Sequence, residues 1–288
     1  MLKVMNETPV FFKCVNEELM GICHHCSSTG HVGVLIIVGG PQYRVGSHRQ
    51  FVLLARHFAD CGIATFRFDY RGMGDSSGEQ ISFEYIDADI CAAIDTFMKM
   101  VPQLKSIVLW GLCDAASAAM IYAHTDSRVK GLILLNPWAR SEQGISKVYL
   151  KNYYLKRLID KAFWRKIYQK EIRYNEVIFG FWMTLVKAFG GGMLLERSRY
   201  SGVDGFTFTD RMLLGIEKFS GNSLLILCGD DLTAQEFRNH VTSSSRWKAV
   251  LKKPQITERN LADANHTFSK TVWRNQVADW CVAWVQKL

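Results

Sequence analysis

The most informative part of the chain is the stretch VLWGLCDA, residues 108–115. The apolar run Val108–Trp110 passes through Gly111 into an alanine-rich segment, which predicts a buried strand, a tight turn and a helix. Cys113 would lie at the turn, where close backbone leaves room only for small residues two positions before and two positions after it. Gly111 and Ala115 meet this requirement. The stretch therefore indicates a nucleophile elbow in which cysteine takes the usual place of serine.

A cysteine in such a turn does not by itself indicate catalysis. Buried cysteines that follow strands are more often packing residues. At the start of a helix, however, Cys113 would lie at the positive end of the helix dipole, which favours the reactive thiolate. The catalytic interpretation therefore depends on an acid and a histidine elsewhere in the chain.

Both partners follow later in the sequence. The apolar run 223–228 is followed by two aspartates, and His266 lies in the segment ADANHTF, residues 262–268, before a final helix. The order nucleophile, acid, histidine differs from both common orders of the serine proteases. In this hypothesis His266 takes the proton of Cys113, while the carboxylate orients the imidazole and stabilises its charged form.

The choice between the two aspartates stays open. Asp231 is favoured over Asp230, because Asp230 directly follows a glycine at the exit of the predicted strand. Among the histidines after the acid, His240 is expected on a helix and His266 in a loop. His266 and Asp231 are therefore the predicted partners of Cys113, with Asp230 as the alternate acid.

The oxyanion of an acyl-transfer intermediate needs backbone N–H donors. The first is expected to be the N–H of Asp114, directly after the nucleophile. The second is expected from the turn GGPQ, residues 39–42. Because Pro41 has no N–H, Gly40 or Gln42 must supply it.

Two further side chains are candidates for the mouth of the substrate site. Arg44 and His48 follow the turn at residues 39–42 by only a few positions. We expect them to face the same opening as the oxyanion donors.

Strand-like and helix-like segments alternate along the chain, which predicts an α/β fold with a mostly parallel sheet flanked by helices. An opening hairpin is expected over 10–15 and 19–24. The further expected strands are 32–38, 63–70, 106–110, 131–135, 223–228 and 255–258. The expected helices begin near residue 47 or cover 82–100, 114–123 and 269–288.

One interval breaks this alternation. Between residues 138 and 219 there is no buried-strand run, and apolar residues of helical period mark 155–167. We expect an inserted helical cap at 138–219, with the glycines at 190–192 as a joint. The core would then consist of 1–137 and 220–288.

Composition excludes several classes of protein. The 288 residues are 48% hydrophobic and 22% charged, which is unlike a disordered, collagen-like or disulfide-rich chain. No apolar run is long enough to span a bilayer, and the N-terminus lacks the pattern of a signal peptide. We therefore expect a cytoplasmic protein whose eight cysteines are reduced.

The net charge of +8 is concentrated in one segment. Residues 140–173 contain ten lysines and arginines and three acidic residues, a net charge of +7. This segment could be a solvated helix face, or it could bind an anionic acyl donor, an acidic polysaccharide or the surface of the inner membrane. No nucleic-acid recognition module is visible, so nucleic acid is not an expected partner.

Two other motifs predict neither a metal nor a cofactor. Cys23-His24-His25-Cys26 lacks a second ligand pair at zinc-finger spacing, and a strand would direct its side chains to opposite faces. The turn RGMGD, residues 71–75, lacks the pattern of a phosphate-binding loop.

Several segments together resemble a known family. The segment RFDYRGMGDS, residues 67–76, resembles the strand-and-turn signature of the α/β hydrolases. A narrower group, the hydrolases associated with the exosortase system and encoded near exopolysaccharide genes in Gram-negative bacteria, is similar in four further segments. These are GGPQYRVGSHR at 39–49, GLCDAAS at 111–117, DLTAQEF at 231–237 and ANHTF at 264–268.

The resemblance implies an α/β-hydrolase fold and an enzyme that forms an acyl-enzyme on its nucleophile. Cysteine instead of serine favours thioesters or activated esters, because a thiolate needs less help from its base. Hydrolysis of an ester or thioester is the leading hypothesis. The alternatives are transfer of the acyl group to a sugar hydroxyl, or a non-catalytic protein that docks through its basic segment.

Overall fold

The computed structural model describes residues 7–26, 30–40, 42–139 and 205–288. The chain divides into two compact units, Met1–Trp138 with Thr209–Leu288, and Ala139–Phe208. Almost all described residues belong to the first unit, to which the following paragraphs refer. The predicted cap falls mostly outside the described residues, whereas residues 209–219, which we expected in the cap, belong to the first unit.

The first unit is built on one eight-stranded sheet with the order β1-β2-β4-β3-β5-β6-β7-β8. Strand β2 pairs antiparallel with both β1 and β4. The remaining neighbours in the order β4-β3-β5-β6-β7-β8 pair in parallel. The strands are β1 (Glu7–Cys14), β2 (Glu17–His24), β3 (Val32–Ile37), β4 (Thr65–Phe68), β5 (Ser106–Leu112), β6 (Val129–Leu135), β7 (Asn222–Asp230) and β8 (Ile256–Asn265). This confirms the predicted mostly parallel sheet.

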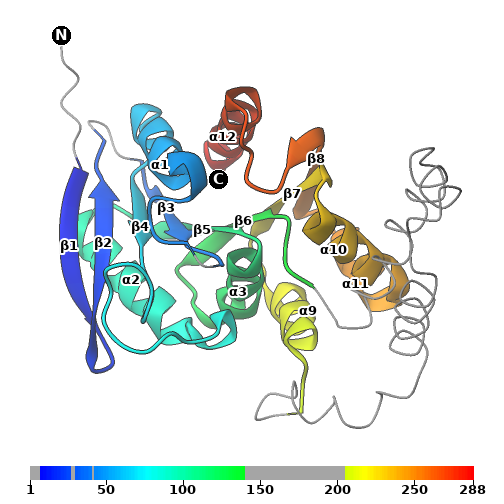
Figure 1. Ribbon diagram of the computed structural model, residues 1–288, viewed down its shortest axis with the longest axis horizontal. Coiled ribbons are helices and arrows are strands. Elements are labelled where there is room, and N and C mark those ends of the chain that lie inside the picture. Colours follow the sequence, from blue (N-terminus) through cyan, green and yellow to red (C-terminus); the bar gives the residue numbers. More distant parts are fainter. Residues whose placement is uncertain (1–6, 27–29, 41, 140–204) are drawn as a thin grey trace, which may run out of the picture. The chain divides into compact units, whose positions relative to one another are not determined.

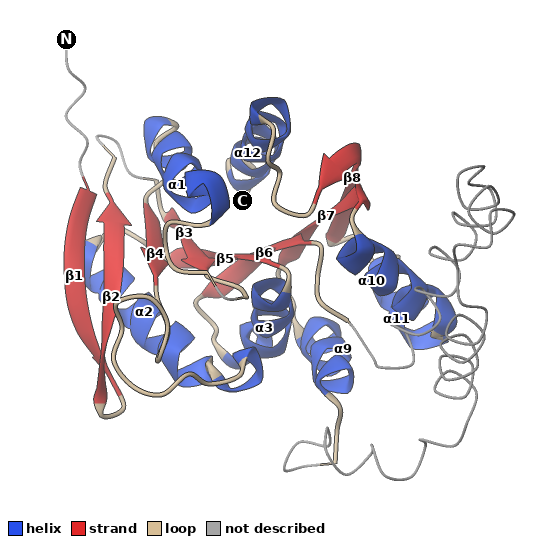
Figure 2. Ribbon diagram, viewed as in Figure 1, coloured by secondary structure: helices blue, strands red, loops and turns tan. Residues whose placement is uncertain are grey.

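Helices cover both faces of the sheet (Figures 1 and 2). In both views α1 and α12 lie on one side and α2, α3 and α9 on the other. The helices are α1 (Gln50–Asp60), α2 (Asp87–Met100), α3 (Asp114–Tyr122), α9 (Phe208–Lys218), α10 (Leu232–Ser243), α11 (Ser245–Leu251) and α12 (Thr271–Val285). Short 3-10 turns occupy Ser47–Arg49, Phe83–Tyr85 and Ala123–Thr125.

The central strands are buried on both faces, which explains their continuous apolar sequence. In β3, Val34 and Ile36 pack in the cluster beneath α1 and α12, and both are fully buried. Leu35 and Ile37, which alternate with them, are equally buried and point to the opposite face. The predicted buried strand at 32–38 is therefore confirmed, and it lies between β4 and β5.

Two elements differ from the sequence-based expectation. Strand β8 continues to Asn265 instead of ending near residue 258, because it is an edge strand whose exposed polar residues give no apolar run. The helix expected at 82–100 is divided. Ser82 accepts a hydrogen bond from the N–H of Glu84 and starts a 3-10 turn, and α2 begins only at Asp87.

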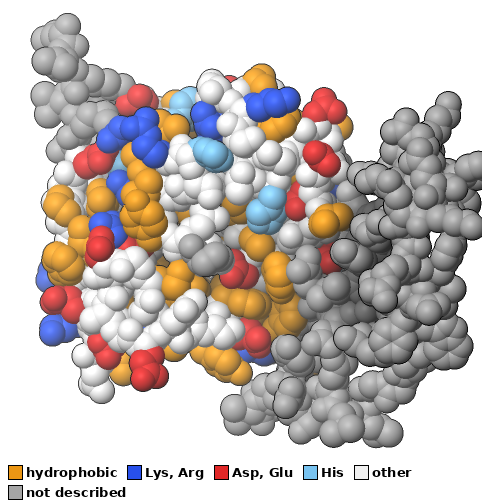
Figure 3. Space-filling view, viewed as in Figure 1, with side chains coloured by type: hydrophobic (Ala, Val, Ile, Leu, Met, Phe, Trp, Pro, Cys, Tyr) orange, Lys and Arg blue, Asp and Glu red, His pale blue; other side chains and the backbone are white. Residues whose placement is uncertain are grey.

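Charges of both signs are mixed over the face of this unit that Figure 3 shows. Within the described ranges, no helix is both long and apolar enough to cross a membrane.

Candidate active site

Cys113 lies in the turn between β5 and α3, as the sequence predicts. Its backbone has φ 64° and ψ −126°, a conformation that residues with a side chain rarely adopt. The N–H of Cys113 donates to the carbonyl of Leu135 at 2.9 Å, and its own carbonyl accepts from Ala116 at 3.1 Å. A Cβ at Gly111 would lie 2.5 Å from the backbone of Ala115. The glycine is therefore required for the turn to close.

The structure brings His266 and Asp231 together. His266 Nδ1 lies 2.9 Å from Asp231 Oδ2. A carboxylate can only accept, so Nδ1 carries the proton and Nε2 is left as the basic nitrogen. Asp231 is buried, while Asp230 is exposed and continues strand β7. Of the two aspartates, Asp231 is thus the one that contacts the histidine.

The loop that carries His266 is held by hydrogen bonds to the last residue of β8. Asn265 Oδ1 accepts from the N–H of Ser269 at 3.1 Å, and Asn265 Nδ2 donates to Ser269 Oγ at 2.8 Å. The N–H of Phe268 donates to the Asn265 carbonyl at 3.2 Å, and the Phe268 side chain is buried. These contacts fix the backbone on both sides of the histidine.

Asn136 is a positioning residue that the sequence analysis did not identify. It is fully buried after β6, and its Oδ1 accepts from the N–H of Cys228 at 2.8 Å. Its own N–H donates to Ile226 at 3.0 Å. Asn136 therefore ties the end of β6 to the part of β7 that leads to Asp231. The only local signal was the position of an Asn-Pro pair directly after a buried strand.

The predicted oxyanion donors face a side chain of the protein itself. The Gly40 N–H donates to both carboxylate oxygens of Asp114, at 2.7 Å to Oδ1 and 2.9 Å to Oδ2. Gly40 has φ 62°, which glycine adopts without strain. The side chain of Gln42 binds the next turn, where its Oε1 accepts from the N–H of Ser47 at 3.0 Å, and its backbone N–H stays a predicted donor.

Arg44 binds two carboxylates instead of facing an open mouth. Its guanidinium pairs with Asp69, and a second nitrogen lies 2.5 Å from Asp75 Oδ2. Its backbone N–H also donates to Asp69, at 2.5 Å. The Arg44 side chain is only 11% exposed. The prediction that Arg44 faces the mouth of the substrate site is therefore wrong, because Arg44 joins its loop to the turn after β4. His48 is exposed, with φ 52°.

Four other cysteines are held as protonated thiols by burial. Burial raises the pKa of Cys14 to about 11 and those of Cys23, Cys228 and Cys281 to about 12. All four are buried packing residues. His24, of the motif that invited a zinc interpretation, instead accepts from Arg67 Nε at 2.9 Å.

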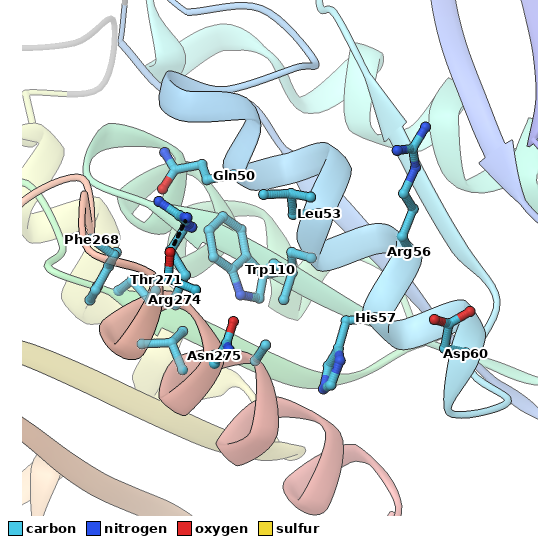
Figure 4. Close-up of a pocket in the computed structure, with 14 residues that line it drawn as sticks. Gln50, Leu53, Arg56, His57, Asp60, Trp110, Phe268, Thr271, Arg274 and Asn275 are labelled. Carbon is cyan, nitrogen blue, oxygen red and sulfur yellow. Dashed lines mark hydrogen bonds between the residues drawn. The ribbon is translucent and has the colours of Figure 1, made fainter.

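A cavity of about 340 Å³ lies between α1 and α12 (Figure 4). Its lining includes Gln50 and Trp110, whose side-chain nitrogens are buried without a hydrogen-bond partner. Arg274 also lines it, but its guanidinium already donates to Ser269 and Thr271. Phe268, two residues after His266, also lines the cavity, and Figure 4 draws it on the same side as Gln50 and Arg274.

The family profile of the alpha/beta hydrolase fold matches residues 33–179, just over half of the chain. The chain belongs to the α/β hydrolase family. Within this α/β hydrolase the match includes β3, the turn at residues 39–42, the elbow with Cys113 and strand β6.

Solved structures share the fold. An esterase of Pyrococcus furiosus is 15% identical and superposes with a TM-score of 0.65, covering 98% of this chain and 93% of its own. The Est1E protein of Butyrivibrio proteoclasticus, solved with ferulic acid bound, is 14% identical with a TM-score of 0.60, covering 96% and 99%. No curated protein sequence matches the chain. The predicted fold class is confirmed, and the narrower resemblance to exosortase-associated hydrolases stays a prediction.

Proposed function

We propose that this α/β hydrolase cleaves an ester or thioester through an acyl-enzyme on Cys113. The observation that carries the proposal is the 2.9 Å hydrogen bond between His266 Nδ1 and Asp231 Oδ2, in a chain whose elbow presents Cys113. Burial raises the pKa of Asp114, the residue after the nucleophile, and His266 is among the groups that oppose this shift.

The first half-reaction acylates the enzyme. His266 Nε2 takes the thiol proton, and the Sγ of Cys113 forms a bond to the carbonyl carbon of the substrate. The bond from that carbon to the leaving oxygen or sulfur breaks, and His266 gives its proton to the leaving group. Asp231 keeps the proton on Nδ1 and stabilises the imidazolium that forms.

The second half-reaction releases the acid. His266 takes a proton from water, the hydroxide attacks the thioester carbonyl, and the bond from carbon to Sγ breaks. The thiolate then recovers the proton, and the acid leaves. A sugar hydroxyl in place of water would give the acyltransferase reaction. The likeness of residues 39–49 and 111–117 to exosortase-associated hydrolases supports a role in exopolysaccharide-related metabolism.

The proposal is tested by intact-protein mass spectrometry after exposure to p-nitrophenyl esters and acyl-CoAs. We expect one acyl group on the native protein and none on Cys113→Ala. Cys26→Ala is the control. Cys26 follows the end of β2, which pairs with the N-terminal end of β4, whereas the elbow follows the C-terminal end of the parallel strand β5. An adduct that persists in Cys113→Ala, or no adduct with any donor, would contradict the proposal.

The products separate the remaining alternatives. Release of free acid indicates hydrolysis, and an acylated sugar formed with added acceptor indicates transfer. A protein that docks without catalysis would form neither product, and the basic segment at 140–173 would then be its functional part.

A further inference from the structure

The Asp114 carboxylate accepts hydrogen bonds from one of the predicted oxyanion donors. Gly40, the predicted second donor, gives its N–H to this carboxylate at 2.7 and 2.9 Å. The N–H of Ala115 donates to Asp114 Oδ1 at 2.9 Å. Gly40, a predicted donor of the hole, is therefore engaged by this side chain.

The space around this carboxylate is closely fitted. A Cβ on Gly39 would collide with Asp114 Oδ1, so the turn at residues 39–40 can approach the elbow only because residue 39 is glycine. Asp114 is partly buried, and burial raises its pKa, against the opposing effect of the hydrogen bonds from Gly40 and Ala115 and of His266. Burial raises the pKa of the nearby Tyr70 phenol, and the charges of Asp114 and Asp89 add to this shift.

This arrangement conflicts with acyl transfer as it stands. Oxyanion donors stabilise a transition state only when they point at the position of the developing negative oxygen. Here the Gly40 N–H instead points at a carboxylate, in short, charge-assisted hydrogen bonds. A substrate carbonyl cannot use this donor until the Asp114 side chain turns away, and an oxyanion formed beside it would meet a like charge.

We propose that Asp114 is a specificity-determining gate of the active site. Its carboxylate fills the oxyanion hole of the resting enzyme, and a substrate must displace it before Cys113 can attack. The gate rests on the proposed acyl-enzyme function. It discriminates against small esters, which offer little binding energy beyond the carbonyl, and favours esters or thioesters whose other groups are bound elsewhere and supply the energy of displacement.

A purely positioning role for Asp114 makes the opposite prediction. In that role the carboxylate would hold the turn at residues 39–40 against the elbow, and its loss would deform the hole. Small esters would then react more slowly with Asp114→Ala, and Asp114→Asn, whose amide oxygen can still accept from Gly40, would restore the rate.

The test measures two reactions of Cys113 in the full-length protein. The first is acylation by p-nitrophenyl acetate, followed by nitrophenolate release and by mass spectrometry, which needs the oxyanion hole. The second is alkylation by iodoacetamide, which forms no oxyanion and reports the thiol alone. Asp279→Asn is the control, because Asp279 is an exposed residue of α12 that pairs with His57 of α1.

We expect Asp114→Ala to be acylated at least about ten-fold faster than the native protein, against an alkylation rate changed less than about two-fold. Asp114→Asn should show a smaller increase, and Asp279→Asn none. The increase should be smaller for long-chain acyl-CoA, because binding of its other groups supplies the energy that displaces the Asp114 carboxylate. Asp114→Asn also keeps the test valid if the alanine variant does not fold.

The outcomes separate the gate from the chemistry. If the native protein is acylated and both Asp114 variants react equally fast or more slowly, the gate is wrong and the proposed function stands. If only the variants are acylated, both are supported. If neither native protein nor variants are acylated while iodoacetamide still reacts, the acyl-enzyme proposal fails and the gate fails with it.

Discussion

Asp231 makes two contacts with its two carboxylate oxygens. Oδ2 meets His266, and Oδ1 accepts from the N–H of Thr233 at 3.0 Å, so Asp231 is also the N-cap of α10. The cap fixes the rotamer of the carboxylate, and the carboxylate in turn fixes the imidazole. A helix start that the sequence marks only as Asp-Leu-Thr thus sets the geometry of the proposed base.

The two roles of Asp231, as a helix cap and as the partner of His266, can be separated by one substitution. Asparagine caps helices about as well as aspartate, but its amide favours the wrong imidazole tautomer. We expect Asp231→Asn to lower the acylation rate at least about 100-fold while the melting temperature stays within about 2 °C. Asp230→Asn, the matched control, should change neither value. Equal losses in the two variants would contradict the role given to Asp231.

The contacts that sequence reasoning missed connect residues far apart in the chain. The turn at Cys113 and the contact between Asp231 and His266 were predictable because each of these residues lies in a segment with a local signature. Asp114 meets Gly40 across 74 positions, and Asn136 meets Cys228 across 92. Local patterns hold no information about such pairs.

At the scale of elements, the antiparallel pair β2 and β4 contains a buried titratable group. His24 is 1% exposed and accepts from Arg67 Nε at 2.9 Å, a bond that requires the neutral imidazole. Burial lowers the pKa of His24 to about 4, with Arg67 acting in the same direction. Glu7, 3.8 Å from His24 Nδ1, opposes the shift, whereas Arg56 and His25 add to it.

This pair of strands should lose stability in acid. An unfolded histidine binds its proton near pH 6.5 and the folded one near pH 4, so the free energy of unfolding decreases as the pH falls through this range. We expect a loss of about 2 kcal/mol between pH 7 and pH 5 from His24, measured by urea unfolding. The loss should shrink in His24→Gln and persist in His25→Gln. An unchanged pH slope in His24→Gln would contradict this assignment.

The elements were predictable where their burial was uniform. The continuous apolar run of β3 indicated a central strand, and the small residues at 111 and 115 indicated the elbow. Strand β8 was underestimated because an edge strand exposes residues such as Glu258, Arg259 and Asn260, which read as loop. The division of the expected helix at 82–100 depends on a side-chain cap.

At the scale of the whole molecule, the parallel order of the sheet brings the site together. Strands β5, β7 and β8 end at the same edge, and Cys113, Asp231 and His266 follow those ends. The charge is arranged differently. Residues 140–173 hold +7 of the net +8, while the face of the first unit in Figure 3 mixes both signs.

This concentration of charge predicts salt-dependent binding to anionic surfaces. We expect the protein to sediment with vesicles of phosphatidylglycerol at 50 mM salt and to be released at 500 mM, because counterions screen the attraction. Replacement by glutamine of Lys147, Lys151, Lys156 and Lys166 should reduce binding at least about ten-fold. The control replaces four exposed lysines of the first unit, Lys99, Lys105, Lys130 and Lys248. Equal losses in both variants would contradict binding through residues 140–173.

The positive φ of Cys113 has a consequence for the way this fold balances stability against chemistry. Glycine adopts φ 64° freely, whereas a side chain there costs on the order of 1–3 kcal/mol. The residue that would suit the backbone best at this position carries no reactive group. The thiol is therefore placed at a backbone position that costs stability. Replacing Cys113 by glycine would remove the nucleophile and could raise the free energy of unfolding.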